Sequence, residues 1–442
     1  MIVFRRKIYS KILTWKEESK GKSALLIEGP RRVGKSTIVR EFACNEYKSH
    51  IIIDFNKASK EVIDLFNNLM DLDYIFLYLQ AAYKVSLEPR HSVIVFDEVQ
   101  NCPRARQAIK YLVEDGRYDY IETGSLISIK KNTQNITIPS EEERLSMHPM
   151  DFEEFSWAIG NDNLFEMLRT FWDTKKNLGS LHRSIMREFR LYMLVGGMPQ
   201  AVNEYLDTND FQKVDKVKRN IVRLYEDDFL KIDISGRTSK LFMSIPAQLS
   251  SSARRFSTRK VVGKQMEDAI VNYLNLLVDS KTVNICYHCD DPNTGMNLTK
   301  NISNYKLFIA DTGLFITMAF WDNAYSDNII YQKLLSDKLP ANLGYIFENM
   351  IAQMLVANGK QLFYYTWKKD ERHYYEIDFI LSRGTKISPL EVKSSSYRAH
   401  ASLDAFYKKY SARIRNNYLV VPKEMQRDHE ILIIPPYFVP FL

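Results

Sequence analysis

The segment from Gly29 to Thr37 constrains this chain more than any other, because it matches the pattern G-x-x-x-x-G-K-[ST]. An apolar run, Ala24 to Ile27, precedes it, and a helical pattern follows it. In this context the loop amides and the helix N-terminus face the phosphates of a nucleotide. Lys35 would reach the β- and γ-phosphates, and the Ser36 hydroxyl would bind magnesium. The residues predicted to contact the nucleotide are Gly29, Pro30, Arg31, Arg32, Val33, Gly34, Lys35, Ser36 and Thr37.

A second apolar run, Ser92 to Phe96, ends in the acidic pair Asp97 and Glu98. A carboxylate at the end of a buried strand can hold the magnesium ion while its neighbour orients the attacking water. We therefore predict Asp97 as a metal ligand and Glu98 as the catalytic base. The alternative is that the two acids only end a core strand and cap the next helix.

Polar and basic side chains farther along the chain are candidates for the same site. Thr123 and Ser125 follow a further strand-like run and are placed to sense the γ-phosphate or the water, although a turn with its own hydroxyl hydrogen bonds is the alternative. Arg144 is the candidate arginine finger, in cis or in trans, with Arg31 and Arg32 as alternatives. For each arginine the competing interpretation is a solvated side chain.

The order of apolar runs predicts the architecture. Runs at residues 24–27, 50–53 and 92–96 alternate with helical stretches, which indicates an α/β fold with a parallel sheet. Beyond about Pro149 long helical patterns follow, and then short helices with two strands, the order of a winged helix. After Gly344 the pattern returns to α/β. With 442 residues, of which 45% are hydrophobic, the chain can bury several cores.

Several short motifs lie along nearly the whole chain. They are Gly-Pro-Arg-Arg-Val-Gly-Lys-Ser at 29–36, Phe-Asp-Glu-Val-Gln at 96–100, Thr-Gly-Ser-Leu at 123–126, Gly-Gly-Met-Pro at 196–199, Tyr-Glu-Asp-Asp at 225–228, Asp-Thr-Gly-Leu at 311–314 and Glu-Val-Lys at 391–393. Together they resemble a large family of prokaryotic AAA ATPases with a C-terminal domain of unknown function.

The resemblance implies four domains. They are an AAA-type P-loop ATPase core at 1–150, a helical lid at 151–236, a winged-helix domain at 237–314 and a C-terminal domain of restriction-endonuclease-like fold at 315–442. In related signalling ATPases a Gly-x-Pro of the lid packs on the nucleotide base, which assigns that contact to Pro199. The chain departs from the family before Arg144, where the expected glycine is replaced by acidic residues, and this weakens the assignment of the finger.

A C-terminal set of charged residues resembles the active site of PD-(D/E)XK nucleases in its order. Glu348 lies on a predicted helix, Asp378 on a strand, and Glu391 and Lys393 form an E-x-K at the end of an apolar run. Two carboxylates can gather divalent ions that polarise a phosphodiester, while the lysine steadies the nucleophile or the developing charge. The alternative is a nuclease-like fold without activity, in which the glutamate and the lysine form a partly buried ion pair.

The charge balance permits a nucleic-acid partner without requiring one. The net charge of +7 is spread over 61 basic and 54 acidic residues. The clearest basic cluster lies in the winged-helix segment, where it would contact DNA phosphates or form a domain interface. It consists of Arg254, Arg255, Arg259, Lys260 and Lys264.

Cysteine usage and hydropathy indicate a protein of the reducing cytosol. Four cysteines in so long a chain do not make a disulfide framework. The motif Cys286-Tyr-His288-Cys289 lacks the second ligand pair that structural zinc needs, so we interpret it as a strand end. No secretory signal and no apolar stretch of about 18 residues is found, which predicts a cytoplasmic protein that does not enter the membrane.

These features predict an ATP-binding protein with Mg²⁺-dependent ATPase activity that acts as a molecular switch or motor, with DNA as a candidate partner. One alternative is a nucleotide-regulated module that controls a protein partner with little turnover. The other is an ATP-regulated, metal-dependent nuclease. DNA-stimulated turnover distinguishes the first from the second, and metal-dependent cleavage identifies the third.

Overall fold

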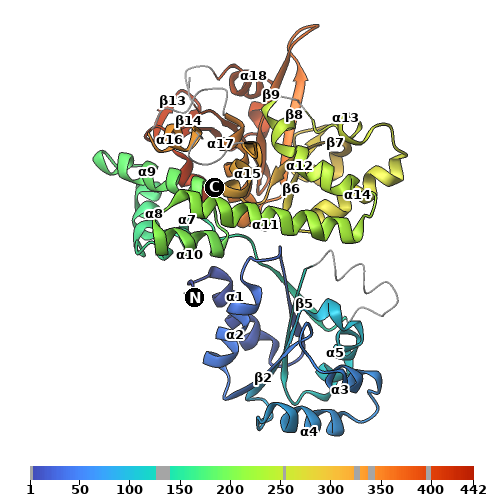
Figure 1. The fold of residues 1–442 in the computed structure, drawn as a ribbon. Helices are drawn as coiled ribbons and strands as arrows, with labels where there is room; N and C mark the ends of the chain where they lie inside the picture. The colour runs from blue at the N-terminus through green and yellow to red at the C-terminus, as the bar shows by residue number, and fades with distance from the viewer. Residues whose placement is uncertain (1–2, 126–139, 252–254, 323–328, 337–343, 395–399) are drawn as a thin grey trace. The chain divides into compact units, whose positions relative to one another are not determined.

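The computed structural model describes residues 3–125, 140–251, 255–322, 329–336, 344–394 and 400–442 (Figure 1). The chain divides into two compact units. The N-terminal unit comprises Met1–His148 together with Asp279–Lys281, and the second unit comprises Pro149–Val278 and Thr282–Leu442.

The N-terminal unit is built on a five-stranded sheet in which neighbouring strands pair in parallel, in the order β2-β3-β4-β1-β5. The strands are β1 (Ala24–Glu28), β2 (Ser49–Asp54), β3 (Ser92–Asp97), β4 (Asp119–Gly124) and β5 (Glu142–Ser146). Strands β1, β3 and β4 are buried along their whole length, as is typical of parallel strands covered on both faces. The α/β class with a parallel sheet is confirmed here.

Helices cover both faces of this sheet (Figure 1). They are α1 (Lys7–Ser19), α2 (Lys35–Glu46), α3 (Lys60–Asp64), α4 (Leu72–Tyr83) and α5 (Pro103–Asp115). One apolar cluster joins α1 and α2 to the sheet, and another joins α3, α4 and α5 to it. Alternate residues of β1 divide between them: Leu25 and Ile27 belong to the first cluster, and Ala24 and Leu26 to the second. Apolar side chains on both faces thus hold the strand that leads into the Gly29–Thr37 loop.

The second unit begins with helices. They are α7 (Phe152–Ala158), α8 (Leu164–Thr174), α9 (Ser180–Val195), α10 (Pro199–Thr208) and α11 (Phe211–Ile232). Helix α7 starts with a capping box, in which Asp151 and Glu154 each accept a backbone N–H of the other. The segment predicted as a lid is therefore helical, and its action as a lid stays a prediction.

Two segments distant in sequence form a four-stranded sheet in the order β7-β6-β8-β9. Helices α12 (Arg237–Ser250), α13 (Thr258–Val262) and α14 (Glu267–Asp279) precede its first strands, and the strands are β6 (Val283–Cys289), β7 (Lys300–Ile309), β8 (Leu362–Lys368) and β9 (Tyr374–Ile377). Strand β6 pairs antiparallel with β7 but parallel with β8. The two segments predicted as separate domains, 237–314 and 315–442, therefore contribute strands to one sheet. The winged-helix assignment stays a prediction.

The C-terminal part adds a five-stranded sheet in the order β10-β11-β12-β14-β13. Its elements are α15 (Thr312–Ala319), α16 (Ile329–Leu335), α17 (Gly344–Ala357), β10 (Phe379–Arg383), β11 (Lys386–Val392), α18 (Ala401–Tyr410), β12 (Asn417–Val420), β13 (Gln426–Asp428) and β14 (Ile431–Ile434). The strand predicted to carry Asp378 is interrupted at that residue, where β9 ends and β10 begins in a different sheet. The restriction-endonuclease-like assignment stays a prediction.

Two of the family motifs meet inside the second unit. Asp311 Oδ2 accepts a hydrogen bond of 2.5 Å from the backbone N–H of Gly197, which lies 114 residues away. A Cβ atom on Gly313 would lie 2.6 Å from the Cα of Gly196, so the close approach of the two backbones requires glycine. The buried Lys218 donates to the carbonyl oxygens of Leu194 (2.7 Å) and Gly313 (3.3 Å). These motifs form a joint between α9, α11 and the start of α15.

Candidate functional site

The loop from Gly29 to Gly34 leaves the carboxyl end of β1 and turns back into α2. A Cβ atom on Gly29 would lie 2.3 Å from the carbonyl oxygen of Met147, so only glycine fits there. Arg32 (φ 69°) and Gly34 (φ 101°) are in the left-handed region, and Gly34 immediately precedes the first residue of α2. The N-terminus of α2, with its unpaired backbone N–H groups, is thus directed into the loop, which is the arrangement that binds phosphate.

Lys35 is enclosed by this loop. Its side chain is buried, and Nζ donates hydrogen bonds of 3.0 Å to the carbonyl oxygens of Gly29 and Pro30. Burial lowers the pKa of Lys35, although the nearby carboxylates of Asp97 and Glu98 oppose that shift. Carbonyl oxygens are neutral acceptors, so the ammonium group keeps its charge available for an anion.

Asp97 joins the loop to the neighbouring strand ends. Its Oδ1 accepts a hydrogen bond of 2.7 Å from the Ser36 hydroxyl and a second one from the Thr123 hydroxyl. Asp97 is the last residue of β3, Thr123 lies in β4, and Ser36 is in the first turn of α2. Three residues far apart in the sequence thus converge at the carboxyl edge of the sheet.

Glu98 leaves β3 in a left-handed conformation (φ 57°). Its backbone N–H donates to Thr123 Oγ1 (3.2 Å), and its carboxylate accepts a hydrogen bond from Gln100 Nε2. These contacts hold the acid beside Asp97 and Lys35. Gln100 was not predicted as a site residue, although it stands in the motif at 96–100.

Arg6 also supports the loop, and sequence reasoning missed it. Its guanidinium donates to the carbonyl oxygen of Val33 (3.0 Å) and to that of His148 (2.6 Å), and the side chain is buried. The group therefore ties the loop to the segment after β5. A basic residue just before an amphipathic helix carries no local signal of this role.

Other predicted residues of the nucleotide site are placed as follows. Arg31, Arg32 and Thr37 are exposed on the loop and the first turn of α2, and Ser125 is half-buried just after β4. Pro199 is the first residue of α10 and belongs to the second unit. Their roles stay predictions.

Arg144 lies within β5, opposite Leu26 of β1 in the strand register. Its Nε donates to Glu142 Oε1 at 2.8 Å, and 43% of the side chain is exposed. The same Glu142 accepts three hydrogen bonds of 2.8 to 3.1 Å from the buried Arg106. The contact with Glu142 directs Arg144 toward this charged layer, two residues before the strand end, and its role as a finger stays a prediction.

The acids predicted for the C-terminal domain lie on neighbouring elements. Glu348 is on α17, Asp378 lies between β9 and β10, and Glu391 is near the end of β11. Asp378 Oδ2 accepts a hydrogen bond of 2.7 Å from the backbone N–H of Val392, next to Glu391. Lys393 Nζ lies 2.7 Å from Glu391 Oε1. The structure thus places Asp378 beside the E-x-K segment.

Two residues that the sequence did not suggest belong to this cluster. The ligand atoms of Glu348, Glu376 and Asp378 lie within 4.8 Å of one another. Lys306 Nζ lies 2.8 Å from Glu348 Oε1 and 2.5 Å from Glu376 Oε1. Lys306 comes from β7, 42 residues before Glu348, so no local spacing links the two.

Burial raises the pKa values of two acids in this cluster, Asp378 and Glu391. Burial raises the pKa of Asp378 well above its usual range, and the carboxylates of Glu348, Glu376 and Glu391 add to the shift while Lys306 opposes it. Burial also raises the pKa of Glu391, against the effect of Lys393. Among the described residues, none donates a hydrogen bond to the buried Oε2 of Glu391.

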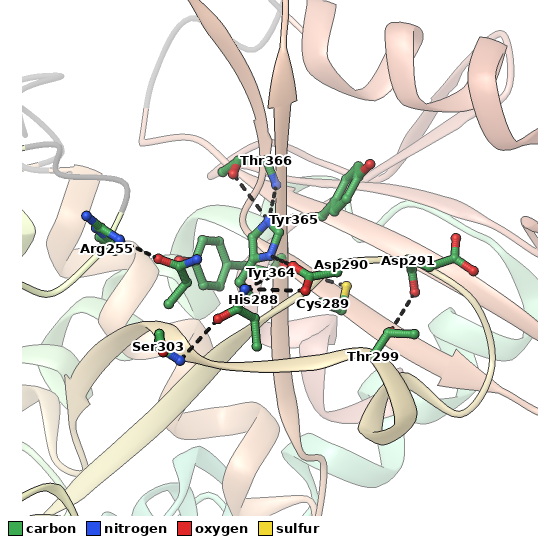
Figure 2. A network of polar contacts seen from close by, with 12 residues as sticks. Arg255, His288, Cys289, Asp290, Asp291, Thr299, Ser303, Tyr364, Tyr365 and Thr366 are labelled. Atoms are coloured by element: carbon green, nitrogen blue, oxygen red, sulfur yellow. Dashed lines mark hydrogen bonds and ion pairs between the residues drawn. The ribbon is translucent and has the colours of Figure 1, made fainter. Parts of the chain in front are cut away.

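The Cys286–Cys289 segment forms ordinary strand contacts, which Figure 2 shows for its second half. His288 Nε2 lies 3.2 Å from the backbone N–H of Thr366, and Nδ1 lies 3.1 Å from Asp290 Oδ1. Cys289 Sγ donates to the carbonyl oxygen of Tyr364 (3.5 Å). The segment thus forms the end of β6, as its interpretation as a strand end predicted.

Most of the predicted basic cluster is exposed near α13. Arg259, Lys260 and Lys264 are solvent-accessible, and Arg255 donates to Asn304 Oδ1 at 2.7 Å (Figure 2). Arg254 lies outside the described residues. The surface therefore presents positive charge, and a DNA contact there stays a prediction.

Comparison with known families supports the assignment of the loop. Residues 21–156 match the family model of an AAA domain. The N-terminal unit contains a P-loop AAA domain. Residues 186–325 and 343–437 match two domain families of unknown function. No curated protein matches the chain.

Several solved structures are similar to this chain at a distance. A Walker-type ATPase of Pyrococcus abyssi is 17% identical, with 72% of this chain and 96% of that chain covered and a TM-score of 0.40. The ORC1 protein of Aeropyrum pernix in complex with DNA is 11% identical (74% and 94% covered, TM-score 0.28). Cdc6p of Pyrobaculum aerophilum is 12% identical (76% and 94% covered, TM-score 0.24). Likenesses at these scores carry no argument about activity.

Among the described residues, no helix is both long and apolar enough to cross a bilayer.

Proposed function

We propose that the N-terminal unit binds ATP with Mg²⁺ and hydrolyses it, and that the protein acts as a nucleotide-driven switch or motor. The observation that carries this proposal is the convergence of Ser36, Asp97 and Thr123, with a distance of 2.7 Å between Ser36 Oγ and Asp97 Oδ1. A serine hydroxyl from a phosphate-binding loop beside a strand-end carboxylate is the ligand set that P-loop ATPases use for magnesium.

The side chains fit the ion by their chemistry. Hydroxyl and carboxylate oxygens are the hard donors that magnesium prefers. Asp97 is buried at the carboxyl end of β3. Ser36 and Asp97 would hold the ion, whose charge would offset that of the β- and γ-phosphates. Lys35 would exchange its two carbonyl acceptors for phosphate oxygens, and the N-terminus of α2 would favour their negative charge.

Glu98 is the proposed base. Its position rests on two contacts, the backbone hydrogen bond to Thr123 and the Gln100 amide on its carboxylate. A carboxylate held in this way can accept the proton of a water that attacks the γ-phosphate. Thr123 contacts both Asp97 and Glu98, so we propose that it reports the state of the phosphate to the two acids.

Two outcomes of ATP binding remain alternatives, a DNA-acting motor and a low-turnover switch for a protein partner. Phosphate release with Mg²⁺, measured with and without single- and double-stranded DNA, separates them. Stimulation by DNA supports the motor, and slow turnover that DNA does not change supports the switch. Lys35→Ala should abolish tight ATP binding in either case, and normal ATP affinity in that variant would refute the proposed site.

A second candidate function is metal-dependent cleavage of phosphodiesters in the C-terminal part. The observation that favours it is the buried Glu391 Oε2 beside Asp378, which suits a divalent ion. Asp378 and Glu391 would hold the ion, and the ion would polarise the phosphodiester. Lys393, 2.7 Å from Glu391, would steady the nucleophile.

Nicking of supercoiled plasmid with Mn²⁺ or Mg²⁺ tests this second candidate. Cleavage should disappear in Glu391→Gln and Asp378→Asn but persist in Glu371→Gln, which alters an exposed acid of the same region. Intact plasmid with the wild-type protein, or equal cleavage by all variants, would exclude it.

A further inference from the structure

An ammonium group occupies the middle of the C-terminal acidic cluster. Lys306 is only 5% exposed, and its Nζ is 2.8 Å from Glu348 Oε1 and 2.5 Å from Glu376 Oε1. The ring of Tyr364 lies beneath it, with its centroid 5.5 Å from Nζ. The ammonium group of Lys306 thus occupies the position between the carboxylates of Glu348 and Glu376.

The strand pairing keeps Lys306 in this position. In β7 it lies opposite Cys286 of β6, and β6 is bonded in turn to β8. Burial alone would lower the pKa of Lys306, but the carboxylates of Glu348, Glu376 and Asp378 raise it well above its usual range. The lysine therefore stays charged at neutral pH.

The net charge of the cluster matches that of one divalent cation. The cluster holds four carboxylates, those of Glu348, Glu376, Asp378 and Glu391, against two ammonium groups, those of Lys306 and Lys393. When all are ionised the difference is two negative charges, which one divalent ion neutralises. Within this cluster, Oε2 of Glu391 is a buried oxygen that lacks a hydrogen bond among the described residues.

We infer that Lys306 takes the place of a second divalent cation between Glu348 and Glu376, so that the cluster binds a single ion, at Asp378 and Glu391. This inference rests on the second candidate function, because that function supplies the single ion. In two-metal hydrolases a pair of ions about 4 Å apart stabilises both the attacking and the leaving oxygen. Here the ammonium group of Lys306 limits the site to a mechanism with one metal ion.

The test is the number of Mn²⁺ ions bound by the nucleotide-free full-length chain, counted from the EPR signal of free Mn²⁺. Wild type should bind one ion, and Glu391→Gln should bind none. Lys306→Met should bind two, because the two carboxylates regain an open position between them. Lys300→Met, on the same strand but outside the cluster, should remain at one.

A folding defect of Lys306→Met does not remove the test. Lys306→Gln loses the charge but keeps a polar side chain whose amide oxygen can serve as a further ligand, and it should also bind two ions. Lys306→Arg keeps the charge and should bind one. In the neutral variants Mn²⁺ should raise the melting temperature by more degrees than in wild type, since a ligand that binds only the folded state stabilises it.

Three results would overturn the inference: two ions in wild type, no ion in wild type, or one ion in both neutral variants. The first would show that Lys306 does not exclude the second ion, and the second would also remove the nuclease candidate. None of them bears on the ATPase proposal, because ATP binding is titrated separately on the same samples and Lys306 lies in the other unit.

Discussion

The loop at Gly29–Thr37 and the C-terminal acidic cluster each bury a lysine next to carboxylates, but they bind the ammonium group differently. Lys35 donates to two backbone carbonyls, and burial lowers its pKa. Lys306 contacts two carboxylates directly, and their charge raises its pKa despite burial. A lysine bound to neutral carbonyls can turn to an incoming phosphate at small cost, whereas one paired with two acids is committed to them. The acceptors thus set the direction in which the pKa of each buried lysine shifts.

The largest loss of unfolding free energy should come from replacing Lys306. Lys306→Met leaves the partly buried Glu348 and Glu376 without their partner. Loss of one member of a fully buried pair typically costs about 3 to 5 kcal/mol, so with these half-buried acids we expect a loss of about 2 to 3 kcal/mol. Lys35→Met removes a buried charge with no acid in direct contact, so its unfolding free energy should fall by less than about 1 kcal/mol. Urea unfolding of the two variants measures both values. Equal losses would break the comparison.

Lys218 extends the comparison, because it is buried and donates to carbonyls, as Lys35 does. Burial lowers its pKa to about 8, against the opposing charges of Asp215 and Asp311. The unfolded lysine titrates near its ordinary value of 10.5, so between pH 8 and 10.5 the unfolded state binds more protons. The stability contributed by this site should therefore rise with pH across that window, by about 3 kcal/mol.

The measurement is the difference in unfolding free energy between wild type and Lys218→Met at pH 7.5, 9 and 10.5. Subtraction removes the other groups that titrate in this range. A difference that stays constant with pH, or that changes in favour of the variant, would contradict the account.

Two acids of the N-terminal unit, Glu142 and Glu122, test whether the hydrogen-bond partners of a buried charged group determine its contribution to stability. Glu142 accepts three hydrogen bonds from Arg106, so Glu142→Gln should destabilise the protein by about 1 to 3 kcal/mol. Glu122 is fully buried without a hydrogen-bond donor to its carboxylate among the described residues, and burial raises its pKa well above the usual range. Glu122→Gln should therefore be neutral or slightly stabilising. Thermal melts of both variants check the prediction, and a larger loss for Glu122→Gln would refute it.

The sequence predicted the nucleotide loop well because its chemistry is local. A strand, a glycine loop and a helix N-terminus are adjacent in the chain, and Asp97 and Thr123 follow from the rule that parallel strands end at one edge. Strand β5 was not predicted, since Glu-Glu-Arg-Leu-Ser has no apolar alternation and β5 depends on its pairing with β1.

Residues that act through distant contacts could not be predicted in this way. Arg6 reaches the loop across 27 residues, and Lys306 reaches Glu376 across 70. Lys306 stands in an unremarkable strand sequence, and only the pairing of β6 with both β7 and β8 brings it to the acids. For such positions a single sequence contains no spacing that would reveal the partner.

The variant Glu98→Gln tests most directly whether Glu98 acts as the base of an ATP-hydrolysing site. ATP affinity with Mg²⁺ should stay at the wild-type value, while the rate of phosphate release should fall by about 10²- to 10⁴-fold, because only the proton acceptor is lost. Glu114→Gln, an exposed acid on α5, should keep the wild-type rate. Wild-type turnover in Glu98→Gln would contradict the account.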